Sequence, residues 1–168
     1  MSFPAILRDY AIFNEGVYVG EGDTARVPKL AYKTEEWIGS GMPAPVEIDD
    51  HLEKLECEWS TKGFYDLPFL QFGERRLSGI GLRFVGHYQE PDTGAVDLIE
   101  VEIRGRHKEI DLGEFKRQDQ GGTKVMSSLV SYKLLKNSRE LIFVDTLSRI
   151  ERYDGKDIIN PIRQFGGF

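Results

Sequence analysis

The sequence predicts a mainly β fold of two packed antiparallel sheets, a β-sandwich or half-barrel, with one short helix. Two observations support this fold class. Many short segments alternate apolar and polar residues with the period of two that half-buried strands show. The 18 glycines among 168 residues also favour a chain of strands and turns over a helical one. With 168 residues, of which 40% are hydrophobic, the chain is large enough to bury a hydrophobic core. We therefore expect a single domain over residues 1–168.

The N-terminal segment, residues 1–24, predicts an arm followed by a small hairpin. Ala11 and Phe13 precede a turn at Asn14-Glu15-Gly16, and Val17 and Val19 follow it. Asn and Gly tolerate the positive φ that tight hairpin turns need. An extended arm without a partner strand is the alternative.

The stretch from Val27 to Gly63 predicts two strands joined by a long arm. Alternation makes Leu30, Tyr32 and Thr34 one face of the first strand. In the second strand Leu55, Cys57 and Trp59 alternate with charged residues. Between them, Gly39–Asp50 contains glycines and prolines that disrupt a strand ladder, so we expect a non-strand arm over about residues 38–50. Long connections in compact domains are usually functional, and an ordinary mobile surface loop is the alternative.

The next segments predict a short helix and a hairpin. A helix is expected over about residues 65–72, with Asp66 as its cap, Pro68 in its first turn and Gly73 at its end. Residues 80–89 and 99–106 then alternate on either side of a turn at 90–94. The polar, glycine-containing stretch 107–122 is interpreted as a loop.

The segment Lys124–Lys136 predicts a long strand that is apolar on both faces. Met126, Val130, Tyr132 and Leu134 fall on one face, and Val125, Leu129 and Ser131 on the other. Such a strand is either central in a two-layer core or contacts another subunit. The apolar tail from Ile158 to Phe168 is expected to dock through Ile162 and Phe165.

No catalytic, cofactor or metal site is predicted. Glu56 and Glu58 form a carboxylate pair, but charged residues at alternate positions are typical of any solvated strand face. The three histidines have no ligand spacing, and Asp49-Asp50-His51 is interpreted as a solvated loop. Gly121-Gly122-Thr123-Lys124 has the wrong order for a phosphate-binding loop.

Composition limits the possible partners and compartment. The net charge is −6, with both signs interspersed, which argues against specific nucleic-acid binding. The single cysteine, Cys57, excludes an internal disulfide and predicts folding in a reducing compartment. No signal peptide is visible, and no apolar run approaches the roughly 18 residues that span a bilayer, so we expect no membrane insertion by the monomer.

A set of short motifs is spread over nearly the whole chain. The motifs are Val27–Leu30, Lys33, Glu35, Gly39, Gly41, Met42, Pro45, Val46, Ile48, Asp49, Glu56–Trp59, Arg83, Phe84, Tyr88, Gln89, Asp92–Gly94, Arg104–Arg106, Lys108–Asp111, Gly113, Tyr132–Leu134 and Asp145. In this order and at compatible spacing, they resemble the major tail tube protein of contractile-tailed phages and R-type tailocins. The strength of the resemblance lies in this spread. The sequence departs at Asn137-Ser138, where Asn-Gly is usual, at Tyr153–Gly155 and at the Phe165–Phe168 end.

The resemblance implies a structural protein without enzymatic activity or a cofactor. Copies would form a hexameric ring in which inner strands, about four from each subunit, join into one large β-barrel around an open channel. Rings would stack into a rigid tube that a contracting sheath drives through the target cell envelope, as a conduit for DNA or ions. Implied partners are further copies, the tail sheath, baseplate and tail terminator proteins, and a tape-measure protein in the lumen. Assembly would take place in the bacterial host cytoplasm, and the product would be the tail of a virion or tailocin.

Three sets of residues are candidates for this role. The first is the inter-ring arm: Trp37, Ile38, Gly39, Gly41, Met42, Pro45, Val46 and Asp49. The second is a set of lumen carboxylates: Glu35, Glu56 and Glu58. The third, if it is not a self-neutralising ladder within one chain, supplies inter-subunit ion pairs: Arg104, Arg106, Lys108, Glu109 and Asp111.

Other functions remain open at this point. A tube protein of a type VI secretion-like injection system would have the same architecture. Co-purification with a sheath and baseplate, with or without packaged DNA, would separate the two. A monomeric ligand-binding β-barrel would stay monomeric at high concentration. An adaptor at the end of a tube would form single rings only.

Overall fold

The computed structural model describes residues 3–159 and contains eleven strands and one short helix. The C-terminal anchors predicted at Ile162 and Phe165 lie outside the described residues. In chain order the elements are β1 (Ile6–Asn14), β2 (Val17–Arg26), β3 (Tyr32–Trp37), β4 (Val46–Leu52), β5 (Leu55–Lys62), α1 (Leu67–Gln71), β6 (Ile80–Gln89), β7 (Val96–Asp111), β8 (Gly122–Lys136), β9 (Arg139–Asp145), β10 (Ile150–Tyr153) and β11 (Lys156–Asp157).

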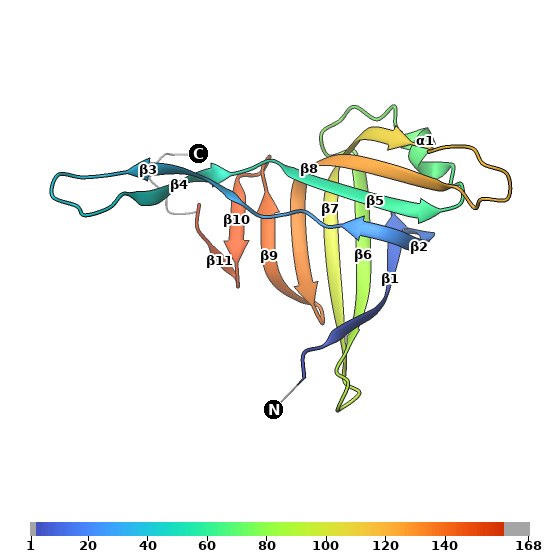
Figure 1. The fold of residues 1–168 in the computed structure, drawn as a ribbon, viewed down its shortest axis with the longest axis horizontal. Helices are drawn as coiled ribbons and strands as arrows, with labels where there is room; N and C mark the ends of the chain where they lie inside the picture. Colours follow the sequence, from blue (N-terminus) through green and yellow to red (C-terminus); the bar gives the residue numbers. More distant parts are fainter. Residues whose placement is uncertain (1–2, 160–168) are drawn as a thin grey trace.

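Nine of these strands form one antiparallel sheet, in the order β11-β10-β9-β8-β5-β2-β1-β6-β7 with a further β7–β8 pairing. The sheet folds into two packed layers because the long strands β7 and β8 bend (Figure 1). In the long layer β1, β6, β7, the second half of β8, β9, β10 and β11 lie side by side. In the crossing layer β2 and β5 run beside the first half of β8. The predicted two-layer, mainly β fold with one short helix is therefore confirmed, although both layers belong to one continuous sheet.

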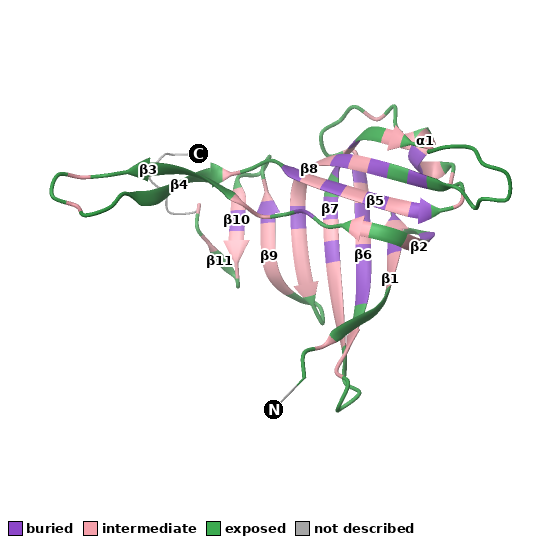
Figure 2. Ribbon diagram, in the orientation of Figure 1, coloured by how far each residue is buried: buried purple, intermediate pink, exposed green. Residues whose placement is uncertain are grey.

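The core lies where the two layers cross, and Figure 2 shows the buried residues concentrated there. Ile12 and Ile103 from the long layer meet Trp59 and Val125 from the crossing layer, and each is at most 1% exposed. Cys57 is buried beside them, and burial raises the pKa of its thiol to about 12. The predicted face of Leu55, Cys57 and Trp59 is confirmed, because all three are buried.

A β-bulge overturns the predicted faces of β8. Simple alternation places Tyr132 and Leu134 opposite Val125 and Leu129. In the structure Leu129 pairs with Gly105 and Ser131 with Arg104, so Val130 is an extra residue in β8. The bulge turns Tyr132 to the same core side as Val125 and Leu129, and all three are at most 7% exposed. β8 is therefore central in the two-layer core.

Gly105 lies at the same irregularity and has a steric reason to be glycine. A Cβ atom there would lie 2.2 Å from the Ser128 carbonyl oxygen and 2.8 Å from the Leu129 Cα. Both are backbone atoms, so a flexible side chain cannot move aside to make room.

The stretch 107–122 was wrongly predicted to be entirely loop. β7 continues to Asp111, and only residues 112–121 connect it to β8. His107 is consequently a buried strand residue that packs edge-on against Trp59. Its Nδ1 lies 2.8 Å from the Ser127 hydroxyl, and its Nε2 lies 3.4 Å from Gln71 of α1. Desolvation lowers the pKa of His107 to about 4, so the ring is neutral at physiological pH.

The short helix α1 lies inside the segment 65–72 predicted to be helical and covers one end of the core. Asp66 occupies its N-cap position without a side-chain hydrogen bond, and Phe72 is its C-cap. Gln71 exchanges two hydrogen bonds with the buried amide of Asn14, at 2.6 and 2.9 Å. Asn14 also begins the predicted Asn14-Glu15-Gly16 turn, which is present. β1 and β2 form the predicted hairpin on either side of it.

Candidate assembly surfaces

The most exposed feature of the molecule is the arm, a two-stranded ribbon of β3 and β4 that pair only with each other. It projects from one end of the body (Figure 1). The prediction that Gly39–Asp50 contains no strand was wrong, because β4 begins directly after Pro45 and pairs with β3 from Trp37–Val46 to Tyr32–Leu52. The glycines and prolines are confined to the tip. The predicted half-buried face of Leu30, Tyr32 and Thr34 was also wrong for β3, all of which is exposed.

The ribbon has one apolar and one acidic face. Directly paired residues share a face, so Trp37 and Val46 lie beside Ile48, each between 45% and 53% exposed. The opposite face carries Glu36, Glu47 and Asp49. Glu35 pairs with Ile48 and therefore lies on the apolar side. Apolar side chains so exposed on a projecting ribbon are typical of an interaction surface.

The tip of the arm is a compact turn. The Met42 N–H donates to the Gly39 carbonyl at 3.2 Å, and the Gly39 N–H contacts the Met42 sulfur at 3.1 Å. The Trp37 ring covers Gly39, where a Cβ atom would lie 2.8 Å from it, and Gly41 has a φ of 85°. Next to the tip Ile38 is 59% exposed. Of the predicted arm residues, Met42 thus stabilises the turn at the tip through its contacts with Gly39. Trp37, Ile38 and Val46 are the exposed apolar residues of the arm.

The base of the arm is fastened to the long layer by a buried carboxylate. Glu151 of β10 is 9% exposed and accepts hydrogen bonds from Tyr32 of β3 and, at 2.8 Å, from Tyr153. Burial, together with the Glu151 carboxylate, raises the pKa of Tyr32. The two phenols therefore remain protonated donors, and the arm leaves the body at a fixed point.

The predicted lumen carboxylates do not lie together. Glu56 and Glu58 are on the solvent face of β5 in the crossing layer, whereas Glu35 is on the arm. Glu56 pairs with Lys108 and, at 3.1 Å, with Lys54, and both lysines lower the pKa of Glu56. Glu58 pairs with Lys124 at 3.1 Å.

The residues predicted to form inter-subunit ion pairs also contact different parts of the molecule. Lys108 reaches across β8 to Glu56, and Arg104 donates to the Ser78 carbonyl at 3.1 and 3.3 Å. Asp111 accepts from the Gly113 N–H at 2.8 Å. For Arg106 and Glu109 the described part of the chain supplies no ion pair. Arg104 also lies 3.9 Å from the Glu15 carboxylate, so Lys108 and Arg104 both have an ion-pair partner within the chain.

A second surface, absent from the predictions, is the solvent face of the long layer. The strand registers align one residue from each of six strands into a transverse row: Phe13, Arg83, Glu102, Lys133, Phe143 and Arg152. The Arg83 guanidinium lies 5.4 Å from the Phe13 ring centre, and Lys133 and Arg152 lie 5.7 and 5.1 Å from that of Phe143. Two residues of the row also form ion pairs with neighbouring glutamates. Arg83 lies 3.1 Å from Glu100, and Arg152 lies 3.0 Å from Glu140. The row could not be predicted, because it depends on the register of six strands.

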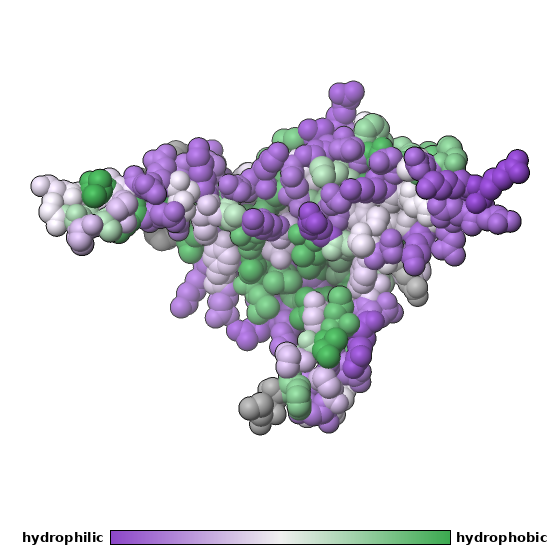
Figure 3. Space-filling model, in the orientation of Figure 1, coloured by the Kyte–Doolittle hydropathy of each residue, from purple (hydrophilic) through white to green (hydrophobic). Residues whose placement is uncertain are grey.

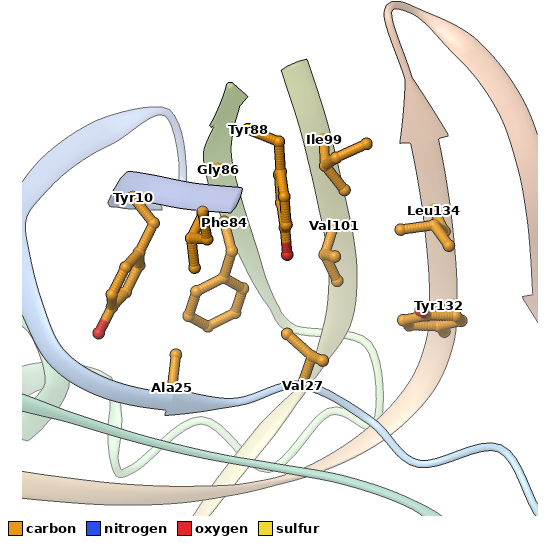
Figure 4. Close-up of a pocket in the computed structure, with 11 residues that line it drawn as sticks. Tyr10, Ala25, Val27, Phe84, Gly86, Tyr88, Ile99, Val101, Tyr132 and Leu134 are labelled. Carbon is orange, nitrogen blue, oxygen red and sulfur yellow. The ribbon is translucent and has the colours of Figure 1, made fainter. Parts of the chain in front are cut away.

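The third surface is an apolar groove of about 430 Å³ between the layers, shown in Figure 4. It exists because the crossing layer covers only part of the core face of the long layer. Figure 3 shows a continuous hydrophobic area at this place. Leu7 and Val27 on its walls are 44% and 42% exposed. The full lining is Leu7, Tyr10, Ala25, Val27, Phe84, Gly86, Tyr88, Ile99, Val101, Tyr132 and Leu134.

Two backbone edges of the long layer also lack strand partners within residues 3–159. β2 pairs with β1 only from Ala11 to Asn14, so one edge of Ile6–Tyr10 is open. At the other side of the layer the last strand is the two-residue β11. Open edges are templates for pairing with another chain.

The described residues contain no helix with the length and apolar character of a membrane span. Within the same residues no group of three or more potential metal ligands is found.

The chain is similar to known proteins along nearly its whole length. A family model described as phage tail tube protein FII matches residues 4–166. The tail tube protein of Escherichia phage P2 is 33% identical over 168 residues, covering 98% of both chains. The major tail tube protein of Serratia phage KSP20 is 32% identical over 161 residues, covering 94% of this chain and 92% of that protein.

Solved structures share the fold. The tube-terminating cap of the anti-feeding prophage superposes with a TM-score of 0.61 at 9% identity, covering 80% of this chain and 93% of that chain. A chain of the sheath–tube complex of an extracellular contractile injection system, PVC, superposes with a TM-score of 0.60 at 9% identity, covering 79% and 92%.

Proposed function

Because the chain belongs to the phage tail tube protein FII family, we propose that its copies close into hexameric rings that stack into the inner tube of a contractile tail. Membership of this family makes the chain a structural tail component and not an enzyme. A ring of subunits with a sheet continuous between them is the assembly that the two open edges of the long layer support best.

Ring closure would join the open edge of β1 in one subunit to the β10–β11 side of the next. These edges lie at opposite ends of one layer, so the contact is head-to-tail and closes when the rotation between copies completes a circle. Joined in this way, all the strands of the long layer would belong to the barrel wall, with β6, β7, β8 and β9 as its long central strands. A barrel this wide leaves an open channel.

In this arrangement the solvent face of the long layer lines the channel, because its other face packs against the crossing layer. The bore would then carry the transverse row instead of Glu35, Glu56 and Glu58. Arg83, Lys133 and Arg152 stand there beside Glu100, Glu102 and Glu140. Paired charges of both signs give a wall with little net attraction for a polyanion such as DNA.

The partners follow from the assembly. The arm would contact the adjacent ring, and the crossing layer, on the outside, would face the sheath. A tube terminator would cap the last ring, and the baseplate would hold the first. A tape-measure protein would occupy the bore during assembly in the host cytoplasm, and the tube would remain in the virion or tailocin tail.

Electron microscopy of the purified, concentrated protein tests this function. We expect hollow rings and stacked tubes. Single rings that never stack would indicate a terminal adaptor, and isolated monomers at every concentration would contradict the proposal. Recovery of the native particle with or without packaged DNA would distinguish a phage tail from a tailocin.

A further inference from the structure

We propose that the interlayer groove of one copy receives the apolar face of the arm of a copy in the neighbouring ring. The inference rests on the proposed function and names the two surfaces of that ring-to-ring contact. The occupant is thus a second copy of this chain. Its arm would enter with Trp37 and Val46 of the apolar face and with Ile38 next to the tip.

The first argument is that neither surface finds a partner within one copy. β3 and β4 pair only with each other, and the arm points away from the body (Figure 1). A ribbon of six residue pairs extends about 20 Å, long enough to leave its own subunit and enter another. Because the fixed Tyr32–Glu151 contact holds the base of the arm, the arm's own groove stays out of reach.

The second argument is chemical fit. The groove, at about 430 Å³, lies within the size range of sites that enclose apolar groups, about 300–1,000 Å³. Its walls carry aromatic and aliphatic side chains such as Tyr88, Ile99 and Leu134, which lie around the cavity in Figure 4. An indole and a branched aliphatic side chain are the groups that such a lining accommodates.

The third argument is charge complementarity. Between Tyr32 and Leu52 the arm carries five carboxylates and one lysine. Glu36, Glu47 and Asp49 have no ion pair with any described residue. At the groove, Val27 is shared with a neighbouring polar depression, which is also lined by Arg26, Lys29, His51, Glu53, Lys54 and Glu56. Of its basic side chains, Arg26 and Lys29 lack an ion pair in the described part of the chain. An acidic ribbon in one copy therefore meets unpaired basic side chains in another.

The compact tip strengthens the argument. The Gly39–Met42 turn fixes the loop between the strands, and Trp37 already packs over Gly39. Little conformational freedom remains to be lost on docking.

Disulfide trapping in assembled tubes tests the contact directly. In one variant Ile38→Cys is combined with Leu134→Cys, whose side chain lines the groove. The matched control combines Ile38→Cys with Leu135→Cys, the next residue on β8, which lies on the opposite face of the strand. The native Cys57 is 1% exposed and stays unreactive. Non-reducing gels should show ladders of linked chains after mild oxidation for the first pair only.

Intact tubes without a ladder, or equal ladders in both variants, would overturn the groove contact and leave the proposed function in place. Failure of the unmodified protein to form rings or tubes would instead contradict the proposed function.

A charge-reversal series tests the same contact in case the cysteine variants do not assemble. Arg26→Glu with Lys29→Glu should raise the concentration needed for tube growth at least tenfold, and Glu36→Lys with Glu47→Lys should do the same. Combining all four substitutions should restore growth toward the original concentration. All four side chains are exposed, so circular dichroism of the variants should match that of the original protein. Absence of both the loss and the recovery would overturn the contact.

Discussion

At the residue scale, close approach of β7 to β8 makes position 105 intolerant of any side chain. Gly105→Ala would force its Cβ against the Ser128 oxygen and the Leu129 Cα. Overpacking against the backbone usually costs about 1–3 kcal/mol, and a movement of the β8 bulge would add to this cost. We expect urea unfolding to show a free energy of unfolding lower by about 3 kcal/mol.

Gly73→Ala is the matched control for this prediction. No atom lies within 4 Å of a Cβ atom at position 73, and its φ is not positive. The free energy of unfolding should stay within about 0.5 kcal/mol of the original value. Equal losses in the two variants would argue against the close approach.

The buried His107 predicts a pH dependence of stability. Its pKa is about 4 in the folded protein against 6.5 for an unperturbed histidine, so the unfolded chain binds the proton first as the pH falls. Stability due to this group is therefore complete above pH 6.5 and is lost progressively between 6.5 and about 4, by up to about 3 kcal/mol. Urea unfolding at several pH values measures the slope.

His107→Gln should flatten that slope, because glutamine keeps a polar group beside Ser127 and Gln71 but does not titrate. His87→Gln, at an exposed position, should leave the slope as it is. An unchanged slope in His107→Gln would show that other groups cause the pH dependence.

At the element scale, the arm depends on its attachment to β10. Tyr32→Phe removes one of the two phenol donors to the buried Glu151 carboxylate. Losing a hydrogen bond to a charged group costs about 1.5–3 kcal/mol. We expect faster amide hydrogen exchange in β3 and β4 and a lower free energy of unfolding. Tyr18→Phe, at an exposed tyrosine in β2, is the control, and an identical exchange rate in both variants would contradict the anchoring role.

The elements also show what the sequence could and could not predict. Alternation was sufficient for β1–β2, β6–β7 and β5, since each has one face in the core. It failed for β8, because the extra residue Val130 is visible only once Leu129 and Ser131 are paired with β7. It also failed for β4, where Pro45 and Gly41 suggested a loop but occupy only the tip of a ribbon.

The candidate surfaces also could be predicted only in part from the sequence. The exposed apolar residues Trp37 and Ile38 could be found from sequence because they stand beside glycines and prolines. The groove could not, because Leu7 and Leu134 have the same apolar character as core residues. Which apolar residues remain uncovered depends on how far the crossing layer extends over the long layer.

At the scale of the whole molecule, the open edge of β1 predicts that assembly can be blocked without unfolding the subunit. Arg8 has no partner in the β1–β6 register, so Arg8→Pro leaves that ladder intact. Proline at an edge removes a donor and obstructs an incoming strand. Size-exclusion chromatography should show a folded monomer, while Arg8→Ala still assembles. Rings formed by Arg8→Pro would contradict pairing through this edge.

The central claim is that the open edges of the long layer join copies of the chain into a closed ring. Native mass spectrometry over a range of protein concentrations tests it most directly. The account predicts a hexamer of the 19.2 kDa chain as the smallest abundant assembly, with larger species at multiples of it. A single species at the mass of one chain, at every concentration up to the solubility limit, would contradict it.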